Sequence, residues 1–148
     1  MKSIIDKNCI QLDMKEKSKN MVIKKMAQCF VDTNRVSDLD SFIQNVYERE
    51  QTEPTSIGNG IGMPHGKTDS VETPSVSIAR LSEPIIWNEE TAEEVTLLIM
   101  IAVPKEDSSN HLKIISQLAR NLMHEEFVNS FRQGDQTTIF NLMNNILN

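Results

Sequence analysis

Apolar residues recur with a helical period in two segments of the first third of the chain. The first stripe predicts a helix through residues 22–31. The second predicts a helix through residues 39–47, with Ser37 or Asp38 as its N-cap, and Pro54 closes this helical region. The stripes consist of Val22, Ile23, Met26, Ala27, Phe30 and Val31, and of Leu39, Phe42, Ile43, Val46 and Tyr47.

The middle of the chain changes to strand patterns. Val76 and Ile78 alternate with smaller or polar residues, which indicates a strand between Pro74 and Pro84. The run from residue 95 to residue 103 is apolar at almost every position and is bounded by a proline. A run of this kind is typical of a central strand that helices cover on both faces.

Helical patterns return in the last third. One stripe, with Ser108 or Ser109 as N-cap, is followed by a shorter helix over residues 125–131 and a last helix over residues 136–147, with Gly134 between them. The stripe is formed by Leu112, Ile115, Leu118, Ala119 and Leu122. The order of helices, strands and helices predicts an α/β fold, a three-layer α/β/α sandwich with a mixed β-sheet, in one domain spanning residues 1–148.

Composition excludes several classes of function. A net charge of −6 without a basic run argues against nucleic acid as the main partner. Cys9 and Cys29 form neither a disulfide framework nor a CxxC zinc pair, so a reducing intracellular setting is the simpler interpretation. The first 13 residues show no secretion signal, and the apolar run of residues 95–103 is too short for a membrane-spanning helix. We therefore expect a cytoplasmic protein without direct membrane insertion.

One segment carries an unusual concentration of turn residues around a histidine. Four of the five glycines lie between residues 58 and 66, and Pro64 directly precedes His65. Glycine permits positive φ and close approach, and proline stiffens the chain, so the pattern predicts an exposed imidazole on a constrained, narrow loop.

Several chemistries are open to such a histidine. It can be a general base, a metal ligand or a nucleophile, or the segment can simply be a tight turn. His111 and His124 are available as further metal ligands, but their spacings from His65 match no metal pattern. The glycine spacing matches neither of the common phosphate-binding loops, and no GxSxG hydrolase motif is present.

The segment from Glu50 to Gly66 closely resembles the phosphorylation-site motif of the fructose/mannitol class of enzyme IIA domains of bacterial sugar phosphotransferase systems. It ends in Ile57-Gly58-Asn59-Gly60-Ile61-Gly62-Met63-Pro64-His65-Gly66. The resemblance covers nearly the whole chain. Lys67-Thr68-Asp69 and Asn110-His111-Leu112-Lys113 look like the fructose-type branch. Two positions depart from the usual pattern, because Gly62 replaces a common alanine and Asn59 replaces the glutamate of many mannitol-type members.

The resemblance implies a phosphotransferase that works through a phosphohistidine. His65 would be the nucleophile, attacking through Nε2, with Arg49 and His111 as its helpers and with a supporting loop formed by Gly58, Asn59, Gly60, Pro64 and Gly66. An HPr-type phosphocarrier would be the donor and a cysteine of an enzyme IIB domain the acceptor, with no metal or other cofactor. From the residues alone, a solvated helix end is the commoner explanation of an arginine such as Arg49, and His111 is also compatible with a helix-start histidine facing solvent.

The same resemblance leaves a second function open. Standalone relatives of this kind act as nitrogen-type regulatory modules, in which the phosphorylation state of the histidine would control binding to other proteins. For the transport function, we expect a shallow apolar rim around His65, which Ile61 and Met63 would support or form and which the loop of residues 68–73 would border.

Overall fold

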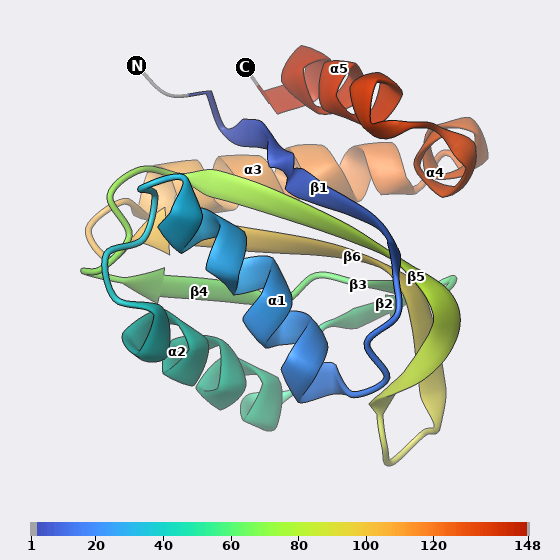
Figure 1. The fold of residues 1–148 in the computed structure, drawn as a ribbon, viewed down its shortest axis with the longest axis horizontal. Coiled ribbons are helices and arrows are strands. Elements are labelled where there is room, and N and C mark those ends of the chain that lie inside the picture. The colour runs from blue at the N-terminus through green and yellow to red at the C-terminus, as the bar shows by residue number, and fades with distance from the viewer. Residues whose placement is uncertain (1–2, 148) are drawn as a thin grey trace.

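The computed structural model describes residues 3–147, apart from the side chains at positions 108 and 110, and shows helices on both sides of one sheet (Figure 1). In chain order the elements are β1 (Ile5–Met14), α1 (Lys19–Asp32), α2 (Leu39–Thr52), β2 (Ser56–Gly58), β3 (Ile61–Gly62), β4 (His65–Thr68), β5 (Ser75–Asn88), β6 (Glu93–Pro104), α3 (Ser108–Leu122), α4 (Glu125–Gln133) and α5 (Gln136–Leu147).

The sheet is mixed, as the sequence predicts. Its strand order is β1-β5-β6-β3-β2, and β4 also pairs with β6. The long β5–β6 pair is antiparallel, whereas β1 runs parallel to β5 and both β3 and β4 run parallel to β6. Strand β6 is therefore the central strand that the apolar run of residues 95–103 predicts.

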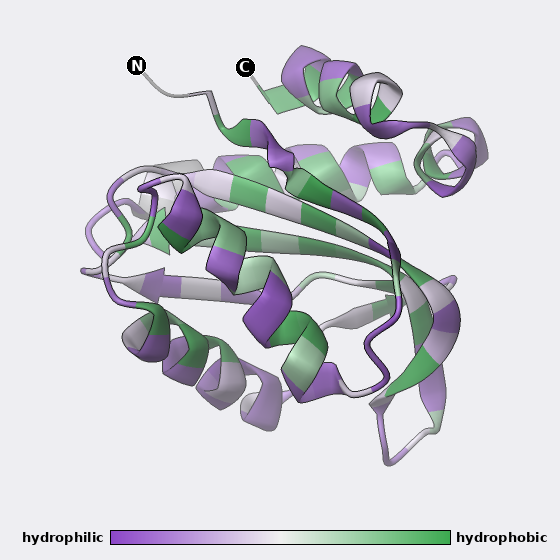
Figure 2. Ribbon diagram, in the orientation of Figure 1, coloured by the Kyte–Doolittle hydropathy of each residue, from purple (hydrophilic) through white to green (hydrophobic). Residues whose placement is uncertain are grey.

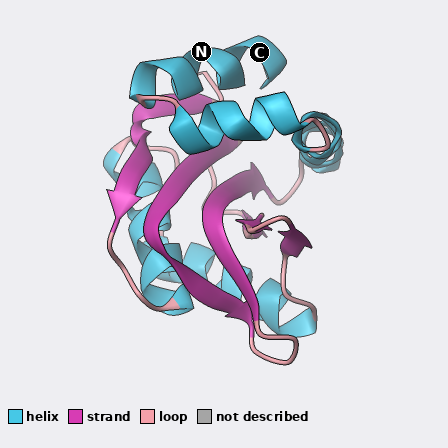
Figure 3. Cartoon of the chain, turned by 90° about the vertical axis from the view of Figure 1, so that its right-hand side faces the viewer, coloured by secondary structure: helices cyan, strands magenta, loops and turns pink. Residues whose placement is uncertain are grey.

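Two separate hydrophobic cores hold the three layers together. Helices α1 and α2 pack on one face of the sheet, and α3, α4 and α5 lie on the other (Figures 1 and 3). Strand β6 contributes to both cores, because Leu98 and Met100 point into the first and Leu97 and Ile99 into the second. The apolar residues of α1 and α2 follow the helix sides that face the sheet (Figure 2). These contacts confirm the α/β/α sandwich.

The two predicted N-terminal helices are confirmed, and their starts are capped by side chains. Ser18 accepts a hydrogen bond from the Met21 amide at the start of α1, and Asp38 accepts one from Ser41 at the start of α2. Each bond satisfies a main-chain N–H group that has no partner within the helix.

Two strands differ from the predictions. Strand β5 continues past Pro84 to Asn88, and its pairing with β6 shifts register between Arg80 and Ile85. A proline lacks an N–H group, but at such an irregularity no ladder bond is required of it. Strand β1 has no counterpart in the predictions, because its pairing with β5 shifts register twice and this breaks the alternation of its apolar residues.

The predicted apolar stripe of α3 is partly wrong. Leu112 is 68% exposed and Ala119 also faces solvent, whereas Ile114, Leu118 and Leu122 are buried. The buried residues are spaced by four, so the buried side of α3 is rotated from the predicted one, and packing in the core shared with β6, α4 and α5 selects it.

The tertiary structure also pairs the two cysteines. Cys9 of β1 and Cys29 of α1 are both buried and are joined by a disulfide, which the sequence does not indicate. Within residues 3–147, no helix is both long and apolar enough to cross a membrane.

Candidate functional site

His65 is the first residue of β4, where that strand joins β6. His65 is paired with Ile101 of β6, and the amide of Ile101 donates to the carbonyl oxygen of Pro64 at 3.0 Å. The side chain is half-buried. The expectation of an exposed histidine on a loop is therefore wrong, because most of the glycine-rich segment forms the short strands β2, β3 and β4 on the sheet.

The imidazole of His65 is held by a main-chain group. Its Nδ1 lies 3.1 Å from the carbonyl oxygen of Met63. A carbonyl only accepts, so Nδ1 carries the proton in the neutral ring and Nε2 keeps its lone pair. Burial lowers the pKa of His65 below its usual 6.5, and the positive charge of Arg49 adds to this, while the Met63 hydrogen bond and the charge of Glu50 oppose it.

His111 lies beside His65 although the two are far apart in the sequence. It belongs to the first turn of α3, and the centroids of the two rings are 5.4 Å apart. Its Nε2 is buried and has no hydrogen-bond partner among the described residues. Burial lowers the pKa of His111, with further lowering from His65 and Lys67. A neutral ring with an unused Nε2 is suited to donate to an anionic group between the histidines.

Arg49 comes from the last turn of α2. One guanidinium nitrogen, Nη1, donates to the carbonyl oxygen of Glu53 at 2.7 Å, and its charge acts on His65 strongly enough to lower the pKa of that histidine. Gly66 lets α2 approach the site this closely, because a Cβ at Gly66 would stand 2.6 Å from Cε1 of Phe42. Asn45 of α2 accepts a hydrogen bond from the Lys67 amide at 2.8 Å. Helix α2 is thus fixed directly on β4.

The first three residues of the supporting loop form a tight turn between β2 and β3, whereas Pro64 directly precedes β4 and Gly66 lies within β4. Gly58, Asn59 and Gly60 have φ angles of 89°, 60° and 76°, in the left-handed region that favours glycine and tolerates asparagine. Two charged residues hold this turn from outside the motif. The Glu93 carboxylate accepts from the Gly58 amide at 3.1 Å, and Arg132 of α4 donates to the carbonyl oxygen of Asn59.

The remaining candidates lie outside this arrangement. His124 is an exposed residue at the start of α4 and makes no side-chain capping bond. Ile61 and Met63 are buried, so they can support a rim around His65 but cannot form it, whereas Leu112 is exposed next to His111. Within the described part of the chain, no three His, Cys, Asp or Glu side chains come together as a metal site.

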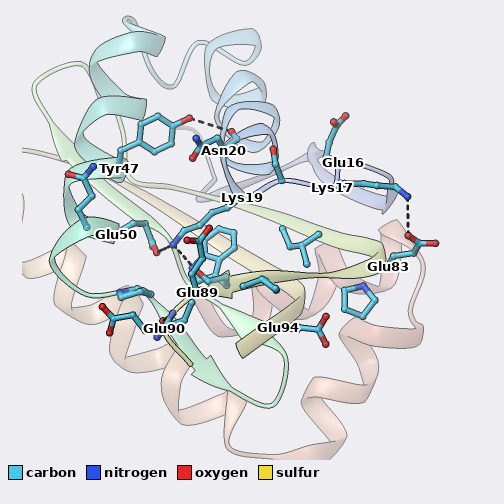
Figure 4. A pocket seen from close by; sticks show the side chains of 18 of the residues that line it. Glu16, Lys17, Lys19, Asn20, Tyr47, Glu50, Glu83, Glu89, Glu90 and Glu94 are labelled. Atoms are coloured by element: carbon cyan, nitrogen blue, oxygen red, sulfur yellow. Dashed lines mark hydrogen bonds and ion pairs between the residues drawn. The ribbon is translucent and has the colours of Figure 1, made fainter. Parts of the chain in front are cut away.

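An open cleft lies elsewhere on the molecule. It is lined by the start of α1, the end of α2 and the β5–β6 hairpin, including Lys19, Glu50 and Glu90 (Figure 4). Neither His65 nor His111 is among its lining residues. The paired histidines therefore lie outside this cleft.

Residues 3–146 match the family model described as "Phosphoenolpyruvate-dependent sugar phosphotransferase system, EIIA 2". The chain belongs to this family. Membership of the EIIA 2 family implies phosphotransferase activity in general and confirms the resemblance found in the sequence.

Individual relatives agree with this assignment. The chain is 31% identical over 140 residues to the PTS system fructose-like EIIA component of Escherichia coli K12, covering 95% of both chains. It is 39% identical over 117 residues to the PTS system fructose-specific EIIA component of Haloferax volcanii, covering 79% of this chain and 76% of that one. These relatives place it in the fructose-type branch.

A solved structure supports the fold. The NMR structure of the complex of enzyme IIAMTL and phosphorylated enzyme IIBMTL from Escherichia coli matches with a TM-score of 0.78 and 23% identity, covering 94% of this chain and 97% of that chain. At this identity the likeness shows the shared fold alone.

Several residues around the site escape prediction from the sequence. Asn45, Glu93 and Arg132 act on main-chain groups across the fold, and nothing in their local sequence indicates this. Glu50 does leave a signal, because it continues the i, i+4 apolar stripe from Val46 and yet carries a charge.

Proposed function

We propose that this protein is a phosphocarrier that accepts a phosphoryl group on Nε2 of His65 from an HPr-type phosphohistidine and passes it to an enzyme IIB cysteine. The observation that carries the proposal is the hydrogen bond from His65 Nδ1 to the Met63 carbonyl, which leaves the Nε2 lone pair as the nucleophile. The lowered pKa of His65 keeps the ring neutral and reactive at neutral pH.

Neither phosphoryl-transfer step requires a cofactor. In the first step, the Nε2 lone pair forms a bond to phosphorus while the donor's P–N bond breaks, and its electron pair returns to the donor histidine. In the second step, a cysteine thiolate attacks phosphorus, and the electron pair of the P–Nε2 bond returns to His65. Nδ1–H remains bonded to Met63 throughout, so His65 needs no proton movement in either step.

The residues next to His65 can neutralise the negative charge of the transferred phosphoryl group. The transferred group carries negative charge on its equatorial oxygens, and catalysis of phosphoryl transfer is mainly positioning and neutralisation of that charge. We assign the Nε2–H group of His111 as a donor to one phosphoryl oxygen, because this atom is buried beside His65 without a partner among the described residues. Arg49 supplies a positive charge from α2 and can pair with two oxygens.

The acceptor is proposed from the family and its relatives. The fructose-type relatives make a fructose-type enzyme IIB domain the first candidate. The structural relative is a complex with a phosphorylated enzyme IIB, which supports an enzyme IIB domain as a partner. Exposed Leu112 beside His111 would belong to the docking rim, with Ile61 and Met63 supporting it from below. The donor and the acceptor would use this one face in turn.

Labelling experiments test the carrier and the acceptor separately. The protein is incubated with a phosphorylated HPr-type donor, and the modified residue is located by mass spectrometry under conditions that preserve phosphohistidine. We expect label on His65, loss of label in His65→Ala, and full labelling of the exposed control His124→Ala. Label on His111 or His124 in the wild type would refute the assignment.

The phosphorylated protein is then mixed with enzyme IIB domains from the same organism. Rapid loss of label to one of them supports transport. Transfer to none of them, together with phosphorylation-dependent binding to a protein outside transport, would instead establish the regulatory alternative.

A further inference from the structure

Glu50 is a charged residue in an apolar position. It lies one turn beyond Val46 on the buried side of α2 and is only 5% exposed. A carboxylate in such a place is unfavourable unless opposite charge and hydrogen bonds surround it. Its partners therefore indicate why the position carries a charge.

Both oxygens of the Glu50 carboxylate are occupied. Oε1 forms an ion pair with Lys19 at 2.9 Å and accepts from the Thr55 amide at 3.1 Å, and Oε2 accepts from the Thr55 hydroxyl. Lys19 is itself fixed, because its Nζ also donates to the Trp87 carbonyl at 2.9 Å and lies 4.7 Å from the centre of the indole ring. Figure 4 shows Lys19 and Glu50 meeting at the wall of the cleft.

Two hydrogen bonds, one between main-chain groups and one from the imidazole ring, continue from Thr55 to His65. The Met63 amide donates to the Thr55 carbonyl oxygen at 3.0 Å. The carbonyl oxygen of Met63 in turn accepts from Nδ1 of His65 at 3.1 Å. An unbroken series of contacts thus joins the buried carboxylate to the ring nitrogen that sets the tautomer of His65.

We propose that Glu50 is a positioning residue for His65. Glu50 is held by Lys19 and fixes Thr55, and Thr55 in turn fixes the carbonyl group of Met63. That carbonyl selects the Nδ1–H tautomer of His65 and so orients Nε2. The proposal rests on the proposed function for the use of Nε2. The negative charge of Glu50 also raises the pKa of His65 slightly and so opposes Arg49, although burial outweighs both effects. Arg49 and Glu50 are adjacent in α2, and the first acts on His65 through its charge whereas the second acts through Thr55 and Met63.

The test uses two variants that remove different parts of this connection. Glu50→Gln removes the charge with little change of shape, and Thr55→Val removes only the hydroxyl donor and leaves the Glu50–Lys19 pair intact. The matched control is Glu48→Gln, because Glu48 is an exposed carboxylate on the same helix. Each full-length variant is checked for its melting temperature and circular dichroism.

Two readouts separate positioning from general stability. Nitrogen-15 NMR of the unphosphorylated protein measures the share of the Nδ1–H tautomer at His65. The rate of labelling by the phosphorylated donor is measured over a series of donor concentrations. In both variants, we expect a smaller share of this tautomer and labelling at saturating donor that is slower by roughly tenfold or more, as displaced catalytic groups typically cause. The control should match the wild type in both readouts.

The possible results are distinct. Folded Glu50→Gln and Thr55→Val proteins with wild-type tautomer and wild-type labelling would overturn the proposal, whatever their melting temperatures. If Glu50→Gln does not fold, Thr55→Val decides. If the wild type takes no label at all, the proposed function fails, but the NMR measurement still decides whether Glu50 sets the tautomer.

Discussion

Substitution of Gly66 by alanine tests how α2 is placed against the site. The added Cβ would lie 2.6 Å from Cε1 and 3.0 Å from Cδ1 of Phe42, and 3.0 Å from Cγ2 of Val46. Carbon atoms pack best at about 3.5–4.0 Å, so the overlap with Phe42 is about 1 Å. Phe42 cannot turn away freely, because it is fully buried with its ring centroid 5.8 Å from that of Phe30 in an edge-to-face contact.

We therefore expect α2 to move away from β4 in Gly66→Ala. Overpacking of this kind typically lowers the free energy of unfolding by about 1–3 kcal/mol. Because α2 also carries Arg49, labelling of His65 should slow as well. Urea unfolding followed by circular dichroism measures the first effect, and the rate of labelling by the phosphorylated donor measures the second.

Two controls establish whether the clash is the cause. In the Phe42→Leu background the obstructing ring is gone, so Gly66→Ala should lower the free energy of unfolding by less. In Gly62→Ala only one atom is close, Cδ2 of Leu98 at 2.9 Å, a single methyl group and not a ring, and the other near atoms are 3.6 Å away. That substitution should change stability by less than about 1 kcal/mol. A Gly66→Ala protein as stable as the wild type, or an equal loss with and without Phe42, would refute the reasoning.

Three further predictions concern the site. Arg49→Lys loses the planar two-point contact with the phosphoryl group, and His111→Ala loses the buried Nε2 donor. Each variant should slow labelling of His65 roughly ten- to a hundredfold, because a charge-assisted hydrogen bond contributes about 1.5–3 kcal/mol. An unchanged labelling rate would remove that residue from the site. Burial lowers the pKa of His65 below 6.5, so between that pKa and pH 6.5 the unfolded chain binds more protons than the folded one, and stability present above pH 6.5 should be lost as the pH falls through the folded pKa. The urea midpoint should therefore fall less with decreasing pH in His65→Gln than in the wild type. Parallel curves of urea midpoint against pH for the two proteins would contradict this. Arg132→Ala removes the donor to the Asn59 carbonyl and should increase amide hydrogen exchange in the turn between β2 and β3, and an unchanged exchange rate would show that the turn holds itself.

The sequence by itself predicts the layers of this fold and the histidine proposed to react. The helical period is sufficient to predict α1 and α2, because each helix buries one continuous stripe, and the predicted cap Asp38 also marks the start of α2. The apolar run of β6 similarly predicts a strand covered on both faces. The glycine-rich segment around His65 carries the resemblance to the family, and the family model that matches residues 3–146 confirms it.

Only the tertiary structure decides which groups surround His65 and which tautomer of its ring they favour. The strand order places β4 beside β6 and so brings the start of α3, with His111, next to His65. Strand β1 and the buried side of α3 depend on pairing and packing partners distant in the sequence, which no local pattern records. The tautomer of His65 depends on the Met63 carbonyl, and Glu50 and Thr55 connect that carbonyl to α2. Hydrogen bonds and charges act over a few ångströms in space, so only the folded chain determines them.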